Sequence, residues 1–177
     1  MHKYYKTLGP VQVLIILAAV AWNTVANCGE IADAARNRDW EKVKTLLKAN
    51  PELVSDKGSL GKTPLIYAVA DDQKDVVETL VANKADVNMG DEHGDSPLHW
   101  AATCGREEIA RFLMMNKANV DVRNNNFQTP LHIAASDGRK DVAELLLNSN
   151  ADVNAQDREY ETPMHLAAGN GTPHPAG

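Results

Sequence analysis

The tetrapeptide Thr129-Pro-Leu-His132 recurs along the chain at a fixed interval. The motif appears 33 residues earlier as Ser96-Pro-Leu-His99 and 33 residues later as Thr162-Pro-Met-His165, and the first copy is Thr63-Pro-Leu-Ile66. A second motif, Ala151-Asp-Val-Asn154, keeps the same phase in the preceding copies. Because several independent positions repeat without an insertion, the sequence predicts a solenoid built from 33-residue units.

The chemistry of one unit predicts a pair of helices. A Thr or Ser hydroxyl accepts a hydrogen bond from a free amide and so caps a helix, and the following proline suits the first helical turn. A glycine such as Gly105 or Gly138 then allows the left-handed turn that ends this short helix. The next segment carries apolar pairs, as at Val142 and Leu146, which lie on one face of a second helix.

These motifs closely resemble those of the ankyrin-repeat family over residues 30–171. The resemblance implies an all-α solenoid of stacked helix-turn-helix units joined by β-hairpin fingers. It also implies that the repeated histidine ties its helix to the neighbouring loop, and that a protein partner binds at the finger tips and the exposed side of the first helices. The structural motif positions are Thr63, Pro64, Ser96, Pro97, His99, Thr129, Pro130, His132, Thr162, Pro163 and His165.

The repeats divide the chain into units. The segment before them lacks the tetrapeptide and is rich in charge, as expected of a capping unit with a polar outer face. After the last copy of the tetrapeptide, prolines replace the second helix of the unit. The helix that begins at this last copy is therefore expected to keep an uncovered apolar side. The expected divisions are a capping unit over 27–57, full repeats over 58–90, 91–123 and 124–156, a truncated repeat over 157–171 and a disordered tail over 172–177.

Residues 1–26 are predicted to be an export signal. Lys3 and Lys6 precede a twelve-residue, nearly all-apolar stretch over 11–22, and small residues follow over 24–26. Three alternatives remain open: cleavage after residue 26, an uncleaved membrane anchor, or lipidation of Cys28, whose context resembles that of bacterial lipoproteins. Each predicts an exported domain, periplasmic or secreted, with membrane anchoring as the alternative.

Charge and cysteine content exclude several classes of protein. The chain has a net charge of −6, and because Lys3 and Lys6 are the only charged residues of the first 26, the remainder carries −8. An acidic body argues against nucleic-acid binding. Two cysteines form no disulfide framework, and no pair of them has zinc-ligand spacing.

Three chemical alternatives are weak. Gly58-Ser-Leu-Gly61-Lys62 lacks the first glycine of a phosphate-binding loop, since Asp56 occupies that position. The repeated histidines are expected about 8–10 Å apart, too far to share a metal ion. Cys104 has Arg106 nearby but no matched base, so an enzyme using Cys104 with a repeat histidine is disfavoured. We therefore expect no cofactor, no metal and no catalysis.

The sequence predicts one partner-binding surface from residues that share a phase in the repeat. Phe127 and Tyr160 occupy the finger position that is glycine at 61 and 94, so each either packs back on its neighbour or is an exposed anchor. The surface comprises Leu60, Lys62, Asp71, Glu92, His93, Asp95, Cys104, Arg123, Asn125, Asn126, Phe127, Gln128, Asp137, Arg158, Glu159, Tyr160 and Glu161.

The predicted function is that of a non-catalytic protein–protein interaction module in an exported compartment. The partner is another protein, and the membrane is reached only through residues 1–26 or a lipidated Cys28. The alternative is a structural protein that self-associates into a homo-oligomer through the uncapped C-terminal end of its stack.

Overall fold

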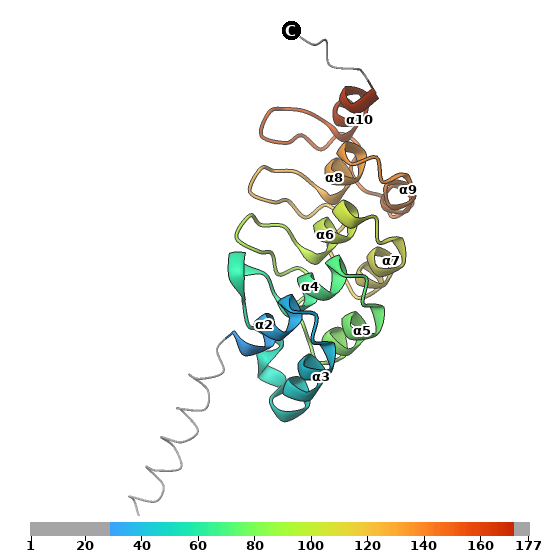
Figure 1. Cartoon of the computed structure of the whole chain (residues 1–177). Coiled ribbons are helices and arrows are strands. Elements are labelled where there is room, and N and C mark those ends of the chain that lie inside the picture. The colour runs from blue at the N-terminus through green and yellow to red at the C-terminus, as the bar shows by residue number, and fades with distance from the viewer. Residues whose placement is uncertain (1–28, 172–177) are drawn as a thin grey trace, which may run out of the picture.

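The computed structural model describes residues 29–171, which form a stack of helix pairs with loops projecting from one side (Figure 1). The predicted export signal, Cys28 and the predicted tail over 172–177 lie outside the described residues. In Figure 1 the first helices of the units form one column next to the projecting loops, and the second helices form another column on the side away from the loops. The all-α repeat solenoid predicted from the sequence is confirmed.

Each full unit begins with a capped helix. Thr63 Oγ1 accepts a hydrogen bond from Ile66 N at 3.3 Å, and Ser96 and Thr129 form capping boxes with the histidines three residues on. The prolines that follow lie in the first turn, where no amide hydrogen is needed. The first helices are α2 (Glu30–Arg36), α4 (Pro64–Ala70), α6 (Pro97–Cys104), α8 (Pro130–Ser136) and α10 (Pro163–Gly171).

Each second helix buries its apolar face in the core and exposes its polar face to solvent. Asp39 caps the first of them by accepting a hydrogen bond from Lys42 N at 3.1 Å, and this helix ends before Pro51, as the sequence predicts. A short 3₁₀ turn, η1 (Pro51–Ser55), follows it. The second helices are α3 (Trp40–Ala49), α5 (Lys74–Ala82), α7 (Glu107–Met115) and α9 (Lys140–Asn148).

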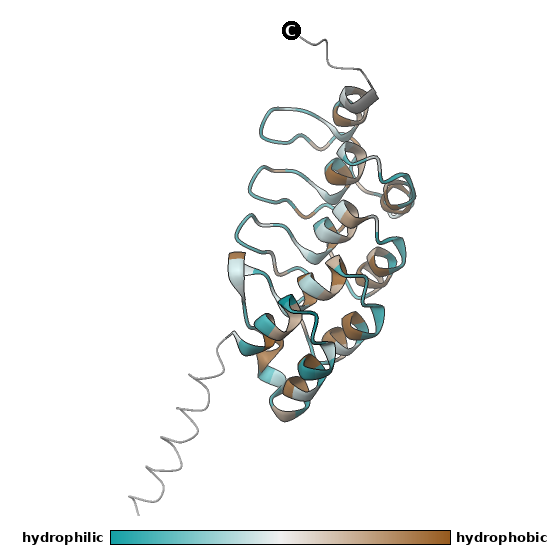
Figure 2. Ribbon diagram, in the orientation of Figure 1, coloured by the Kyte–Doolittle hydropathy of each residue, from teal (hydrophilic) through white to brown (hydrophobic). Residues whose placement is uncertain are grey.

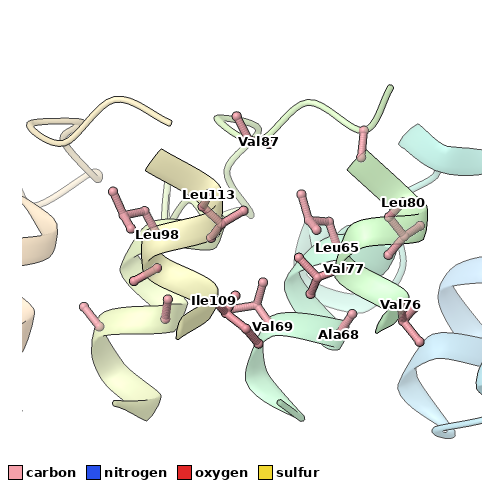
Figure 3. Packing of buried hydrophobic residues seen from close by; sticks show 14 of the residues in the cluster. Leu65, Ala68, Val69, Val76, Val77, Leu80, Val87, Leu98, Ile109 and Leu113 are labelled. Carbon is pink, nitrogen blue, oxygen red and sulfur yellow. The ribbon is translucent and has the colours of Figure 1, made fainter. Parts of the chain in front are cut away.

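The core runs the length of the stack between the two columns of helices. Leu65, Leu80, Leu98 and Leu113 are almost entirely buried, and Figure 3 shows them pointing into the space between neighbouring helix pairs. Figure 2 shows the apolar sides of the helices facing one another, whereas the projecting loops are mostly polar. Each unit therefore depends on its neighbours to cover its apolar faces.

The projecting loops, which we call fingers, contain no regular β-strand anywhere in residues 29–171. Each finger is closed by backbone hydrogen bonds across three and four residues, as from Phe127 N to Asn124 O at 2.9 Å and from Asn124 N to Gln128 O at 3.0 Å. One further backbone bond joins each tip to the next finger, which is too little pairing for a ladder. The fingers are thus tight turns rather than the two-stranded hairpins implied by the family resemblance.

Candidate protein-binding surface

In three of the four fingers, one Asp or Asn side-chain oxygen accepts hydrogen bonds from two backbone amides of the same finger. Asp91 Oδ1 accepts hydrogen bonds from His93 N and Asp95 N at 2.9 and 3.1 Å. Asn124 Oδ1 and Asp157 Oδ1 each accept the corresponding pair of amides in the later fingers. Asx side chains favour such turns because they replace backbone acceptors locally. The tips are therefore held in a fixed shape.

Hydrogen bonds also join the fingers into one row. Glu92 N donates to Leu60 O at 3.0 Å, Asn125 N to His93 O at 2.9 Å and Arg158 N to Asn126 O at 2.9 Å. Two side chains strengthen the row, because Asn125 Nδ2 donates to Glu92 O at 2.9 Å and Arg158 Nη2 to Asn125 O at 2.7 Å. A partner that touches several tips would meet a preformed surface and avoid much of the ordering cost of binding.

Three large apolar side chains stand at the finger turns. Leu60 lies in the short turn η2 (Ser59–Gly61) and is 54% exposed, Phe127 is 51% exposed and Tyr160 is 77% exposed. All three have φ between 61° and 63°, a left-handed conformation that is unusual for bulky residues. The structure thus leaves most of the Tyr160 side chain and about half of the Phe127 side chain exposed to solvent.

A hollow of about 430 Å³ lies between the last two fingers. Phe127 and Tyr160 line it together with Arg123 and Arg158. Arg123 Nη1 donates to Gln156 O at 3.2 Å, so this guanidinium is anchored while the rest of its donors stay available. The last two fingers therefore combine aromatic surface with fixed cations.

The structure separates the other predicted surface residues into a group at the finger tips and a group at the finger bases. The tip group is exposed and consists of Glu92, His93, Asn125, Asn126, Arg158 and Glu159. The base group is partly buried where each finger returns to its first helix and consists of Lys62, Asp95, Gln128 and Glu161.

Several of the charged residues already have partners. Lys62 Nζ lies 3.7 Å from the centroid of the Trp100 ring, and Asp95 Oδ1 accepts a hydrogen bond from Asn124 Nδ2 at 2.8 Å. Asp71, at the end of α4, pairs with Arg38 at 2.9 Å. Asp137 is exposed at the end of α8, one repeat from Cys104 at the end of α6. Lys62, Asp71 and Asp95 are thus less available to a partner than the residues at the tips, whereas Asp137 remains exposed.

The repeated histidines join neighbouring units. His99 Nδ1 accepts from Ser96 N at 3.1 Å, which places the ring proton on Nε2, and Nε2 donates to Gln128 O of the next finger at 3.0 Å. His132 repeats this arrangement with Thr129 N and Glu161 O. Burial lowers the pKa of His99, although the hydrogen bond to Gln128 opposes the shift. His99 is therefore neutral at pH 7 and holds the stack together.

Cys104 has the features of a partly buried, unactivated thiol rather than of a nucleophile. Burial raises its pKa, while the cations of Arg106 and Arg139 only partly oppose this shift. A nucleophilic cysteine needs a lowered pKa or an adjacent base. Cys104 is free, and no histidine accepts a hydrogen bond from it in the described part of the chain.

Two features escaped the sequence reasoning. Trp100 Nε1 donates to the carboxylate of Asp91 at 3.1 Å, which anchors the second finger to α6. Asp91 and Trp100 are nine residues apart with a turn between them, so neither helical nor strand periodicity predicts this hydrogen bond. Leu60 reaches its exposed position through a left-handed turn that is usually reserved for glycine.

Residues 29–171 contain no group of three or more acidic, histidine or cysteine side chains arranged to hold a metal ion. Within the same range, no helix has both the length and the apolar composition needed to cross a membrane.

Comparison with known proteins identifies the family. The family model described as ankyrin repeats (3 copies) matches residues 31–124 and 115–174. Inversin of Gallus gallus is 39% identical over 77 residues, which covers 39% of this chain and 7% of inversin. Ankyrin repeats are protein–protein interaction modules, and the family is generally non-catalytic. Because the family model covers most of the chain, this protein belongs to the ankyrin-repeat family.

Proposed function

We propose that this chain binds a partner protein through the tips of its fingers and the adjoining side of its first helices. The observation that carries the proposal is the exposure of Leu60, Phe127 and Tyr160 on the row of fingers. Aromatic residues are enriched among the side chains that dominate binding energy at protein interfaces. These three contribute little to the core, and their left-handed backbone is unfavourable for folding, so binding supplies a reason for their presence.

The charge pattern defines what such a partner would meet. The exposed tips carry charges of both signs, with Glu92, Arg158 and Glu159 among the apolar anchors, and amides fill the third finger. Charges at an interface fix register and specificity more than they add affinity. The partner is therefore expected to dock along several fingers in one orientation.

We further propose that binding takes place in an exported compartment. The support is the sequence of residues 1–26: two lysines, a short apolar stretch and small residues at the end. The intact mass of the protein from its native host tests this. Loss of the first 26 residues supports cleavage, a lipid adduct on Cys28 supports lipidation, and the full mass in the membrane fraction supports an anchor. The full mass in the cytosol would contradict export.

Photo-crosslinking in the native host tests the binding surface. A photoreactive phenylalanine analogue replaces Tyr160 in one strain and Leu60 in another. Both positions are expected to crosslink to the same protein. The matched control carries the analogue at Met115, which is 79% exposed at the end of α7 in the column of second helices. Crosslinks of equal yield from Met115, or none from either finger, would contradict this binding mode.

A further inference from the structure

The hollow between the third and fourth fingers lies where the repeat pattern changes. At Gly61 and Gly94 the finger turn has no side chain, and a Cβ there would lie 2.9 Å from Glu92 Cγ or 2.8 Å from Asn125 Oδ1. The next finger therefore packs directly on each of these glycines. One repeat further on, the same position is Phe127, so the fourth finger cannot pack on the third in the same way.

The fourth finger meets Phe127 with a longer side chain. Arg158 follows Asn125 by one repeat, and its Nη2 donates to Asn125 O at 2.7 Å. Asn125 Nδ2 makes the equivalent bond to Glu92 O at 2.9 Å. Because arginine is longer than asparagine, the bond is kept although Phe127 now occupies the turn. Arg158, Phe127 and Tyr160 then line the hollow of about 430 Å³ that lies between the two fingers.

Two guanidinium groups line this hollow with unused donors. Arg123 Nη1 donates to Gln156 O at 3.2 Å, and Arg158 bonds to Asn125 O as described. Each guanidinium has five N–H donors, so most of them stay available to a ligand. Among the ion pairs of residues 29–171, none includes either arginine. Both positive charges are therefore left for a partner to neutralise.

The net charge of the lining favours a singly charged anion. Asp157 is its acidic residue, and Asp157 Oδ1 is occupied within its own finger by Glu159 N and Glu161 N at 2.9 and 3.0 Å. Two arginines and one aspartate leave the lining with a net charge of +1. A carboxylate carries −1, whereas a phosphoryl group carries about −1.5 to −2 at pH 7. Carboxylates also match the planar guanidinium in shape.

The aromatic walls make such a contact stronger than an ordinary surface ion pair. An ion pair in open solvent contributes little to affinity. Phe127 and Tyr160 stand on either finger, where they would exclude water from around a bound carboxylate and so strengthen its hydrogen bonds to the arginines. Their rings also offer apolar surface to the methylene groups that carry an acidic head group. The hollow therefore suits an acidic side chain.

We propose that this hollow receives an aspartate or glutamate side chain of the partner protein, held by Arg123 and Arg158 between Phe127 and Tyr160. The inference rests on the proposed function, because it names the chemistry of the segment that the finger tips bind. The chain beyond residue 26 carries −8, so an acidic segment is repelled by most of the molecule and attracted at this hollow. That contrast fixes where along the row of fingers the segment docks.

Charge reversal tests the proposal on the partner that crosslinks from Tyr160. Its crosslinked segment should contain an aspartate or glutamate. Isothermal titration calorimetry then measures its binding to the purified full chain. Arg158→Glu should raise the dissociation constant by at least about 30-fold, since like charges in contact are strongly unfavourable, and Arg123→Glu should act in the same direction. Lys48→Glu, exposed on α3, changes the net charge equally and should leave the constant unchanged.

A charge exchange separates recognition from damage to the row of fingers, because both arginines also bond to backbone carbonyls. Reversing the partner's acidic residue to arginine should weaken its binding to the unaltered chain and restore its binding to Arg158→Glu. A distorted finger would not be rescued in this way. Circular dichroism of each variant must match that of the unaltered chain.

Three results overturn the proposal: an unchanged dissociation constant in both arginine variants, no rescue by the charge exchange, or a bound segment whose anion is a phosphorylated residue. In each case the partner still crosslinks from Tyr160 and Leu60, so binding at the finger tips stands. No crosslink from either position overturns both the binding surface and the acidic recognition.

Discussion

Gly94→Ala should destabilise the protein much more than Gly138→Ala, although both glycines have a left-handed backbone. Gly94 has φ of +77° and Gly138 has φ of +64°, so an alanine at either site incurs about 1–2 kcal/mol of backbone strain. Each alanine also restricts the unfolded chain by a similar amount, so that contribution cancels in the comparison.

The two sites differ in the space around the new methyl group. A Cβ at Gly94 would lie 2.8 Å from Asn125 Oδ1 and 3.0 Å from Asn125 N, whereas a Cβ at Gly138 meets no atom within 4 Å. To relieve the clash, Asn125 must move and weaken its hydrogen bonds to His93 O and Glu92 O. At about 1 kcal/mol per bond, Gly94→Ala should cost about 2–4 kcal/mol and Gly138→Ala about 1 kcal/mol.

Chemical denaturation followed by circular dichroism measures both free energies of unfolding, and amide hydrogen exchange at Asn125 reports the local change. We expect faster exchange at Asn125 in Gly94→Ala and no change there in Gly138→Ala. Equal destabilisation by the two substitutions, with unchanged exchange at Asn125, would refute the reasoning that the fingers are held together by these contacts.

Three further outcomes follow from single positions. Leu113→Ala should lower the free energy of unfolding by about 2–5 kcal/mol, because the side chain is fully buried; a loss below about 1 kcal/mol in denaturation would contradict the packing. Burial holds the pKa of His99 below its ordinary 6.5, so the unfolded chain binds more protons than the folded chain, and the free energy of unfolding falls as the pH drops below 6.5. His99→Gln should reduce this pH dependence of the free energy of unfolding. An unchanged pH dependence would be inconsistent with a neutral buried ring. Cys104 should react with a disulfide reagent at pH 7 more slowly than in the unfolded chain, since burial raises its pKa; faster reaction in the folded chain would reopen a nucleophilic role.

The repeat spacing predicted the helices well because their ends are determined locally. Thr63 and Ser96 mark caps, the prolines after them mark first turns, and Gly105 follows the last residue of α6 in a left-handed conformation. These signals depend on residues within one turn of each other, so a single sequence is enough to locate them.

The fingers could not be predicted to the same depth because they depend on contacts between units. Whether Phe127 packs or projects depends on the neighbouring tip, where Arg158 N bonds to Asn126 O and holds the last two fingers together. The family resemblance implied that the repeated histidine ties its helix to the neighbouring loop, and the structure identifies Gln128 O as the partner of His99.

The central claim is that the finger tips bind a partner protein, and quantitative co-purification from the native host tests it most directly. The tagged full chain is compared with the double variant Phe127→Gly and Tyr160→Gly, which introduces the residue already present at Gly61 and Gly94 and relieves backbone strain. Met115→Gly serves as the exposed control on α7. We expect a stoichiometric partner with the unaltered chain and the control, and its loss with the double variant. Retention of that partner at full stoichiometry by the double variant would contradict the claim.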